Sequence, residues 1–107
     1  MNKKTTKLPS VRNRADIIRR LTKHNKEIQS FKVTRLELFG SAARDELHKH
    51  SDIDVLVEFS ALDTDNYFGL KFFLEDLLGR KIDLVREKAI QPRMLPYVQE
   101  DLYAITP

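Results

Sequence analysis

The sequence contains no cysteine, which excludes disulfide bonds and thiolate metal sites. The absence fits a reducing compartment, and we expect a cytoplasmic protein. There is also no run of about eighteen or more apolar residues, so a membrane-spanning helix is not expected. The first residues, MNKKTTKLPSVRNR, are basic but lack an apolar segment, so we expect no secretory signal.

The chain has 107 residues, of which 41% are hydrophobic and 33% are charged. This length suits one small globular domain with a single core. We expect residues 1–9 to form a flexible basic tail and residues 10–107 to form the domain.

The positive charge is concentrated in the first third of the chain. Residues 1–35 hold eleven lysines and arginines against Asp16 and Glu27, whereas the remainder is acidic overall. Such a basic segment can bind nucleic acid or an acidic partner, or form a solvated helix face. The segment Val11–Gln29 lacks aromatic residues for base stacking, which weakens the nucleic-acid interpretation.

Apolar spacing and turn residues predict alternating helices and strands. We expect a helix from a cap at Ser10 or Asn13 to about Gln29, and a strand at Val33–Phe39 with apolar residues on both faces and so a central position. A short helix Ala42–Leu47 capped by Ser41 should follow, then a strand Ile53–Phe59, a helix Tyr67–Leu78 ended by Gly79, and a strand Lys81–Val85. A helix Arg93–Glu100 with Met94, Leu95 and Val98 inward and an edge strand Leu102–Ile105 complete the prediction. The order indicates an α/β or α+β fold, a small mixed sheet flanked by helices.

Asp52 and Asp54 are spaced so that a strand places both carboxylates on one face. Two like charges repel there unless a cation lies between them. Carboxylates without histidine or cysteine suit a hard cation, Mg²⁺ by default and Mn²⁺ as a second choice. Because Mg²⁺ commonly takes phosphate oxygens as further ligands, the pair predicts a phosphate-bearing substrate.

Two further features extend this candidate site. Gly40 ends a predicted strand and permits close backbone approach to a ligand, and Ser41 opens a helix whose N–H groups favour phosphate. Asp83 lies between apolar residues of a third strand. If that strand neighbours the one carrying Asp52 and Asp54, three carboxylates converge and can hold two cations. Alternatively, Asp52 caps a turn and Asp83 faces solvent on an edge strand.

The segments LFGSAAR and SDIDVLVEF resemble the G-S-x-A-R … D-x-D signature of the DNA polymerase beta-like nucleotidyltransferases. The small size, LLGRKIDLV and QPRMLPYVQEDLYAI are similar to the minimal members, the MNT-type proteins, which are often antitoxins of HEPN-domain toxins. The resemblance implies a polymerase beta-like fold. It assigns nucleotide binding to Gly40, Ser41 and Arg44, and catalysis and metal binding to Asp52, Asp54 and Asp83.

The resemblance implies a protein adenylyltransferase that moves AMP from ATP to a hydroxyl, with a tyrosine of a HEPN toxin as the expected acceptor, and a hetero-oligomer of the two. Two alternatives stay open: an antitoxin that neutralises by binding alone, and a nucleotidyltransferase acting on RNA. One departure is Asp45, where many members have glycine. Its charge weakens phosphate binding if it points inward and is harmless if it points to solvent. His48 and His50 are interpreted as loop surface.

Overall fold

The structure is a computed structural model that describes residues 8–61, 63–100 and 102–105. The elements, in chain order, are α1 (Arg14–Lys23), α2 (Asn25–Gln29), β1 (Val33–Phe39), α3 (Gly40–Ala43), β2 (Ile53–Phe59), α4 (Thr64–Leu78), β3 (Ile82–Val85), the 3-10 turn η1 (Glu87–Ala89), α5 (Leu95–Glu100) and β4 (Tyr103–Ala104). The sheet order is β3-β2-β1-β4. Strands β2 and β3 are parallel, and the other two pairs are antiparallel. This is the small mixed sheet flanked by helices that the sequence predicts.

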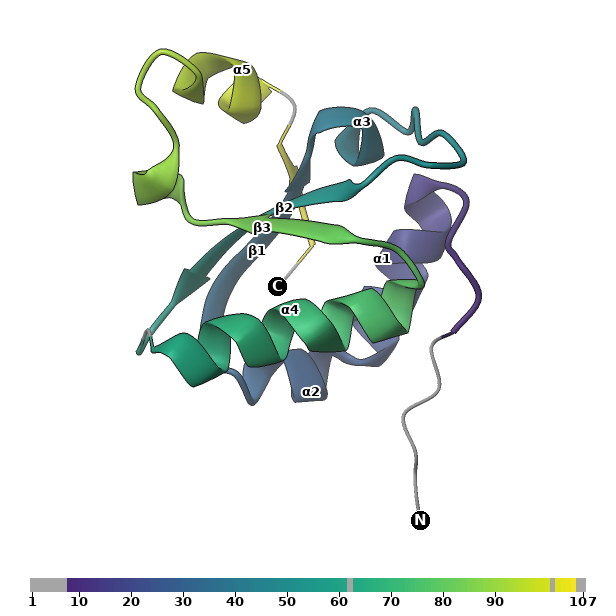
Figure 1. Ribbon diagram of the computed structural model, residues 1–107, viewed down its shortest axis with the longest axis horizontal. Coiled ribbons are helices and arrows are strands. Elements are labelled where there is room, and N and C mark those ends of the chain that lie inside the picture. The colour runs from purple at the N-terminus through teal and green to yellow at the C-terminus, as the bar shows by residue number, and fades with distance from the viewer. Residues whose placement is uncertain (1–7, 62, 101, 106–107) are drawn as a thin grey trace.

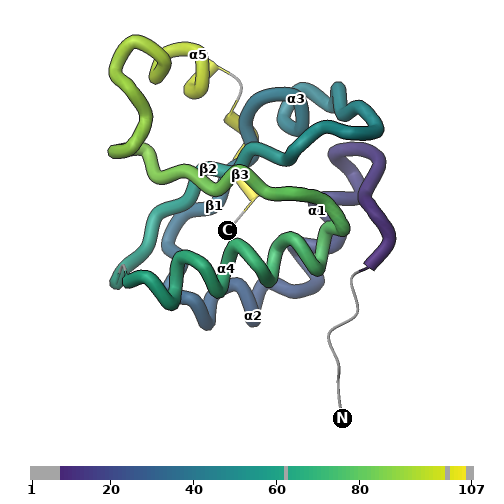
Figure 2. Tube along the Cα trace, viewed as in Figure 1, coloured from purple at the N-terminus to yellow at the C-terminus, as the bar shows by residue number. Residues whose placement is uncertain are grey.

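The helices are divided unequally between the two faces of the sheet. Helices α1, α2 and α4 lie together on one face, while α3 and α5 lie on the opposite side (Figure 1). The tube view shows that both helices of the second group are short (Figure 2). No helix within the described ranges is long and apolar enough to cross a membrane.

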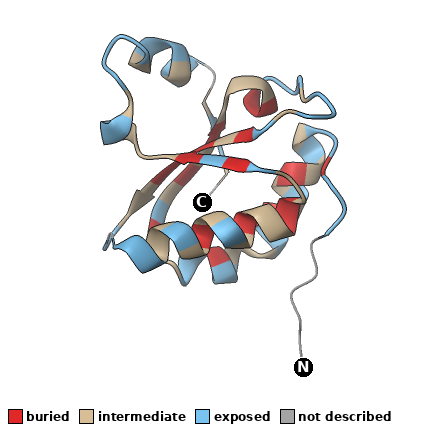
Figure 3. Ribbon diagram, viewed as in Figure 1, coloured by how far each residue is buried: buried red, intermediate tan, exposed pale blue. Residues whose placement is uncertain are grey.

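The hydrophobic core lies between the sheet and the three helices of the first group. Buried residues line the facing sides of these elements, whereas α5 contains none (Figure 3). The largest fully buried side chains include Ile17, Leu21, Leu36, Ile53 and Leu74. Most of the core therefore lies on one side of the sheet, although Leu56 on the other face and Ala42 and Ala43 of α3 are also buried.

Strand β1 is central, as predicted, but Val33 does not share a face with Phe39 as simple alternation predicted. A register irregularity between Val33 and Arg35 in the pairing with β2 adds one residue to β1. A bulge of this kind reverses the alternation of side chains. Val33 consequently shares the buried face with Leu36 and Leu38, and Phe39 lies opposite Asp54 on the other face.

The predicted first helix is divided into two. Asn13 is its cap, as predicted, and its side chain accepts a hydrogen bond from the backbone N–H of Asp16 at 2.9 Å. The helix breaks at His24, whose backbone angles of φ −108° and ψ 25° are not helical. Histidine and asparagine are weak helix formers, and the bend between them lets Ile28 reach the core.

Helix α4 begins three residues earlier than predicted because Asp63 caps it. The Asp63 side chain accepts from the backbone N–H of Asn66 at 2.7 Å. The prediction that Met94, Leu95 and Val98 point inward is wrong in one respect: Met94 is 47% exposed, and Leu95 and Val98 are only partly covered. Helix α5 begins at Leu95 and is too short to bury a full face.

The first seven residues of the predicted tail lie outside the described residues. The last two, Leu8 and Pro9, are attached to the domain. The Leu8 N–H donates to the Asp76 carbonyl at 3.0 Å, and the Arg20 guanidinium donates to the Pro9 carbonyl at 2.6 Å. The packed part of the chain therefore begins at or before residue 8.

We expect Gly79→Ala to destabilise the domain by about 1–2 kcal/mol and to lower its melting temperature by several degrees. Gly79 ends α4 with φ +65°, and an added Cβ would lie 2.4 Å from the Leu8 carbonyl oxygen. Thermal unfolding measures the change. Gly69→Ala is the comparison for the backbone effect: its φ is not in the left-handed region, but its Cβ would lie 2.8 Å from the Phe31 ring, so any loss there comes from side-chain crowding alone. Equal melting temperatures for wild type and Gly79→Ala would contradict this account.

Candidate active site

The pairing of β2 with β3 brings two of the predicted carboxylates together. In the parallel register Asp54 lies directly opposite Asp83. Buried apolar residues flank both positions, Ile53 and Val55 on one strand and Ile82 and Leu84 on the other. The alternation that buries these residues turns both aspartates to the opposite, open face. Asp83 is on an edge strand and exposed, as the alternative interpretation held, and it still neighbours Asp54.

Asp52 lies one residue before β2, at the end of the loop from α3, and is exposed. Its charge still acts on Asp54. Burial, the negative charges of Asp83 and Asp52 and a hydrogen bond with Asp83 together raise the pKa of the Asp54 carboxyl to about 6, while Arg44 opposes them. The three carboxylates thus form one electrostatic unit in which ionisation of the central member is unfavourable.

Gly40 is required beside this cluster for a reason that the sequence did not show. Its backbone adopts φ +65°, and an added Cβ would lie 2.5 Å from Oδ2 of Asp54. Phe39, the preceding residue, pairs with Asp54 across the sheet. Glycine therefore lets the chain turn directly over the Asp54 carboxylate, in addition to any close approach of a ligand.

Ser41 lies within α3 and does not cap it. The helix covers Gly40–Ala43 instead of the predicted Ala42–Leu47, its N-cap is Phe39, and no side chain caps it. The short length follows from Asp45, whose φ of +60° ends the helical path two residues later. Ser41 remains next to Gly40, in the turn that follows β1 beside the Asp54 carboxylate.

Arg44 and Asp45 are neighbours in sequence but contact different parts of the structure. The Arg44 side chain donates to Glu46 at 2.8 Å and acts electrostatically on Asp54. The Asp45 carboxylate accepts a hydrogen bond from the backbone N–H of Arg14 at 2.8 Å. Asp45 is therefore turned to the start of α1 and not toward the carboxylates, and its positive φ accounts for a position that also suits glycine.

Arg80 is a functional residue that the sequence reasoning missed. It follows the end of α4, and its Nε donates to the Val11 carbonyl at 2.8 Å. Its Nη1 donates to the carbonyls of His48 at 2.6 Å and Ser51 at 2.9 Å. One side chain thus fixes the loop that leads into Asp52. An arginine after a helix-ending glycine carries no sequence signal for such a role.

Tyr67 of α4 anchors β3, the strand that carries Asp83. Its hydroxyl donates to the backbone carbonyl of Leu84, one residue after Asp83. Burial raises the pKa of the Tyr67 hydroxyl, and the negative charge of Asp83 adds to the effect. The tyrosine therefore stays protonated and keeps β3 anchored to α4.

The donor set fits a hard divalent cation in its chemistry. It consists of carboxylates alone, and the pKa of Asp54 is raised first by burial and then by repulsion from Asp83 and Asp52, both of which a cation would offset. Among the described residues no three acidic or histidine side chains converge closely enough to hold a metal ion as they stand. Asp52 and Asp83, both exposed, are the members free to reorient toward Asp54.

Comparison with known proteins places this arrangement in a family. The family model described as "Nucleotidyltransferase domain" matches residues 18–104. The chain belongs to the nucleotidyltransferase domain family. The matched segment contains Gly40, Ser41, Arg44 and all three carboxylates, and the family membership confirms that the chain is of the nucleotidyltransferase class of enzyme.

Relatives and solved structures agree with this membership. The chain is 45% identical over 85 residues, 77% of this chain and 87% of the relative, to a Methanocaldococcus jannaschii protein named "Putative protein adenylyltransferase MJ0128". A "Structure of putative minimal nucleotidyltransferase" is similar with a TM-score of 0.66 and 31% identity, covering 80% of this chain and 93% of that one. An MNT antitoxin in complex with a tri-AMPylated Shewanella oneidensis HEPN toxin gives a TM-score of 0.61 at 20% identity, covering 87% and 71%. This last match shows the fold alone.

We expect Asp54→Asn to stabilise the metal-free nucleotidyltransferase at pH 8 but not at pH values below about 4. A raised carboxyl pKa means that the folded state loses stability as pH rises from the ordinary value of 3.8 to about 6. Asparagine does not ionise, so Asp54→Asn removes this loss of stability. Because the group is partly exposed and so screened by solvent, we expect a gain on the order of 1 kcal/mol.

Urea unfolding at both pH values measures this gain. Asp76→Asn, on α4 away from the cluster, is the control and should show no such pH-dependent gain. A stabilisation by Asp54→Asn that is equal at both pH values would contradict the proposed repulsion.

We expect Arg80→Ala to release the loop before Asp52. The change leaves the carbonyls of Val11, His48 and Ser51 without their donors, which costs roughly 1–3 kcal/mol. Arg20→Ala is the matched control, because Arg20 also donates to two backbone carbonyls, those of Pro9 and Leu77, but does not contact this loop. Amide hydrogen exchange should accelerate at residues 48–53 in Arg80→Ala only. Equal exchange there in both variants would refute the positioning role.

Proposed function

We propose that this nucleotidyltransferase transfers AMP from ATP to a hydroxyl group of a HEPN-type toxin and thereby acts as an antitoxin. The proposed acceptor is the hydroxyl of a tyrosine. The single observation that carries the proposal is the pairing of Asp54 with Asp83 beneath the Gly40–Ser41 turn. This pairing brings two of the three proposed metal-binding carboxylates next to the proposed nucleotide-binding turn.

In the proposed reaction the acceptor oxygen attacks the α-phosphorus of ATP and forms a new O–P bond. The bond from that phosphorus to the bridging oxygen breaks, and pyrophosphate leaves. The hydroxyl proton passes to the Asp83 carboxylate, which is exposed on the edge strand and so accessible to a macromolecular acceptor. Gly40, Ser41 and Arg44 would hold the triphosphate, and catalysis consists mainly of positioning and charge neutralisation.

Asp52 and Asp54, with Asp83, would hold Mg²⁺ in this proposal. The bound ion would neutralise phosphate charge and lower the pKa of the attacking hydroxyl. The partial burial of Asp54 keeps its carboxylate fixed, whereas Asp52 is carried on a loop that Arg80 restrains. Binding of the cation would also offset the repulsion that raises the Asp54 pKa.

A protein acceptor suits the open site. The described domain has no further layer above the carboxylates apart from α3 and α5, which are both short (Figure 1). A similar protein carries the name of a protein adenylyltransferase, and a structural neighbour is a complex with an AMPylated HEPN toxin. We infer the toxin as acceptor and partner from these similarities.

We expect the double change Asp52→Asn and Asp54→Asn to abolish label transfer from α-labelled ATP to a HEPN partner in the presence of Mg²⁺, by about 10³-fold or more. Circular dichroism and thermal unfolding should show a retained fold. Asp45→Gly is the matched control, since its carboxylate faces α1 and its φ of +60° suits glycine. We expect transfer by this control within about twofold of wild type.

The outcomes separate the alternatives. Normal transfer by the double variant would overturn the assignment of the carboxylates. A wild-type protein that forms a stable complex with the partner but never labels it would favour an antitoxin that acts by binding alone. Label appearing on RNA ends in place of the protein would favour the RNA-directed alternative.

A further inference from the structure

We propose that a pocket beside the carboxylates, here called the basic hollow, docks an acidic segment of the protein acceptor. It has a volume of about 620 Å³, and its basic lining residues are Arg12, His48, Lys49, His50 and Arg80. The lining contains no aspartate or glutamate. The inference rests on the proposed transfer to a protein and specifies how that protein would be held.

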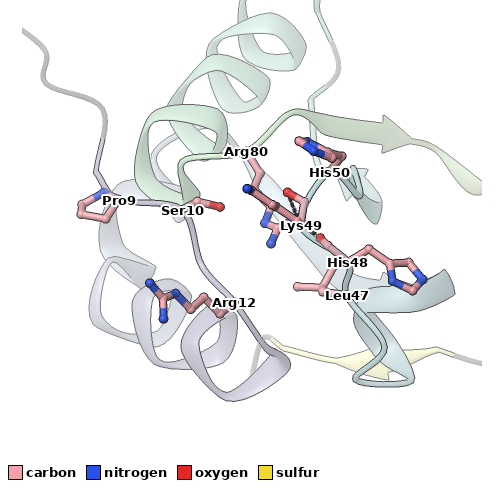
Figure 4. Close-up of a pocket in the computed structure, with 8 residues that line it drawn as sticks. All are labelled: Pro9, Ser10, Arg12, Leu47, His48, Lys49, His50 and Arg80. Carbon is pink, nitrogen blue, oxygen red and sulfur yellow. Dashed lines mark hydrogen bonds between the residues drawn. The ribbon is translucent and has the colours of Figure 1, made fainter.

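The basic hollow is formed where three distant chain segments meet. Pro9, Ser10 and Arg12 come from the segment before α1, residues 47–50 from the loop before Asp52, and Arg80 from the end of α4. In Figure 4, Lys49 and Arg80 lie close together, whereas Arg12 and the His48 ring extend away from each other at opposite sides. Arg80 therefore lies within the hollow, with Arg12 and His48 toward its two sides.

The charges of this lining are uncompensated. Among the described residues none of its five basic side chains forms an ion pair with a carboxylate. Elsewhere Arg19, Arg35 and Arg86 pair with Asp16, Glu37 and Glu58. Even Arg80 uses its guanidinium on backbone carbonyls, which leave its net charge intact. Concentrated cations without internal partners attract an anionic ligand.

The basic hollow adjoins the catalytic carboxylates. A neighbouring recess of about 310 Å³ shares Ser10, Lys49, His50 and Arg80 with it and is also lined by Asp52. A segment seated in the hollow would therefore pass close to Asp52 and present a nearby hydroxyl to the site. The basic charge would also offset repulsion between an acidic acceptor and the three aspartates.

The lining favours a peptide over a nucleic acid. It contains no phenylalanine, tyrosine or tryptophan on which bases could stack, and its apolar members are Pro9 and Leu47. Single-stranded nucleic-acid sites usually combine cations with aromatic platforms. Its volume lies within the ordinary range for a seated ligand, and mixed apolar and basic contacts suit acidic side chains on a peptide.

The test measures binding of a fluorescein-labelled peptide Glu-Glu-Tyr-Glu-Glu by anisotropy at low ionic strength, without ATP or metal. The neutral peptide Gln-Gln-Tyr-Gln-Gln is the reference. We expect Arg12→Gln with Lys49→Gln to weaken binding of the acidic peptide roughly five- to tenfold. The matched control is Lys26→Gln with Lys32→Gln, two exposed lysines outside the hollow, which should change it less than about twofold.

Chemical-shift changes in ¹H–¹⁵N spectra should locate the acidic peptide at residues 47–50 and 80. Lys49→Gln alone provides a second variant if the double variant melts early. Equal weakening by the control pair, or equal binding of the two peptides, would overturn the docking site. An oligouridine RNA that binds more tightly than the peptide and loses affinity in the hollow variant would overturn the peptide assignment.

Because this binding requires neither ATP nor Mg²⁺, it is independent of transfer. Peptide binding with no AMP transfer to any protein would overturn the proposed function and leave the anionic docking site. AMP transfer whose KM for the protein acceptor is unchanged in the hollow variant would overturn the docking site and leave the proposed function.

Discussion

The candidate site depends on a sheet register that holds two carboxylates in adjacent positions. Asp54 and Asp83 oppose each other because the parallel register of β2 and β3 is fixed by the apolar residues that flank them. A slip of one residue would expose these apolar residues and bury the aspartates, at a cost that far exceeds their mutual repulsion. Core burial therefore maintains an unfavourable charge arrangement, and the raised Asp54 pKa is its measure.

The elements around the pair keep it accessible. Gly40 carries the chain over the Asp54 carboxylate where any side chain would collide, and Arg80 restrains the loop that leads to Asp52. The covering helices α1, α2 and α4 all lie on the other face (Figure 1). The division of the sheet into a face that carries most of the core and a face that carries the carboxylates makes a domain of this size sufficient for both.

Local pattern predicted most of the fold, and long-range contacts account for the rest. The strands Val33–Phe39 and Ile53–Phe59 and the stop at Gly79 follow from apolar spacing and breakers. The sequence left open whether the Asp83 strand neighbours the Asp52–Asp54 strand, and the structure shows that it does. The break at His24 and the late start of α5 depend on tertiary packing, which propensity does not encode. The family signature located the carboxylates, but the partners of Asp45 and Arg80 are 31 and 29 or more residues away in sequence.

The two basic features that the signature leaves unexplained have one structural explanation. Arg12, one residue of the basic front end, and the loop of His48 and His50 looked like parts of unrelated solvated segments, yet both line the basic hollow with Arg80, beside Asp52. An acidic acceptor, as proposed, would be repelled by the three aspartates, and a basic surface next to them would lower that barrier. The charge asymmetry of the sequence would then set which acceptors can approach the carboxylates.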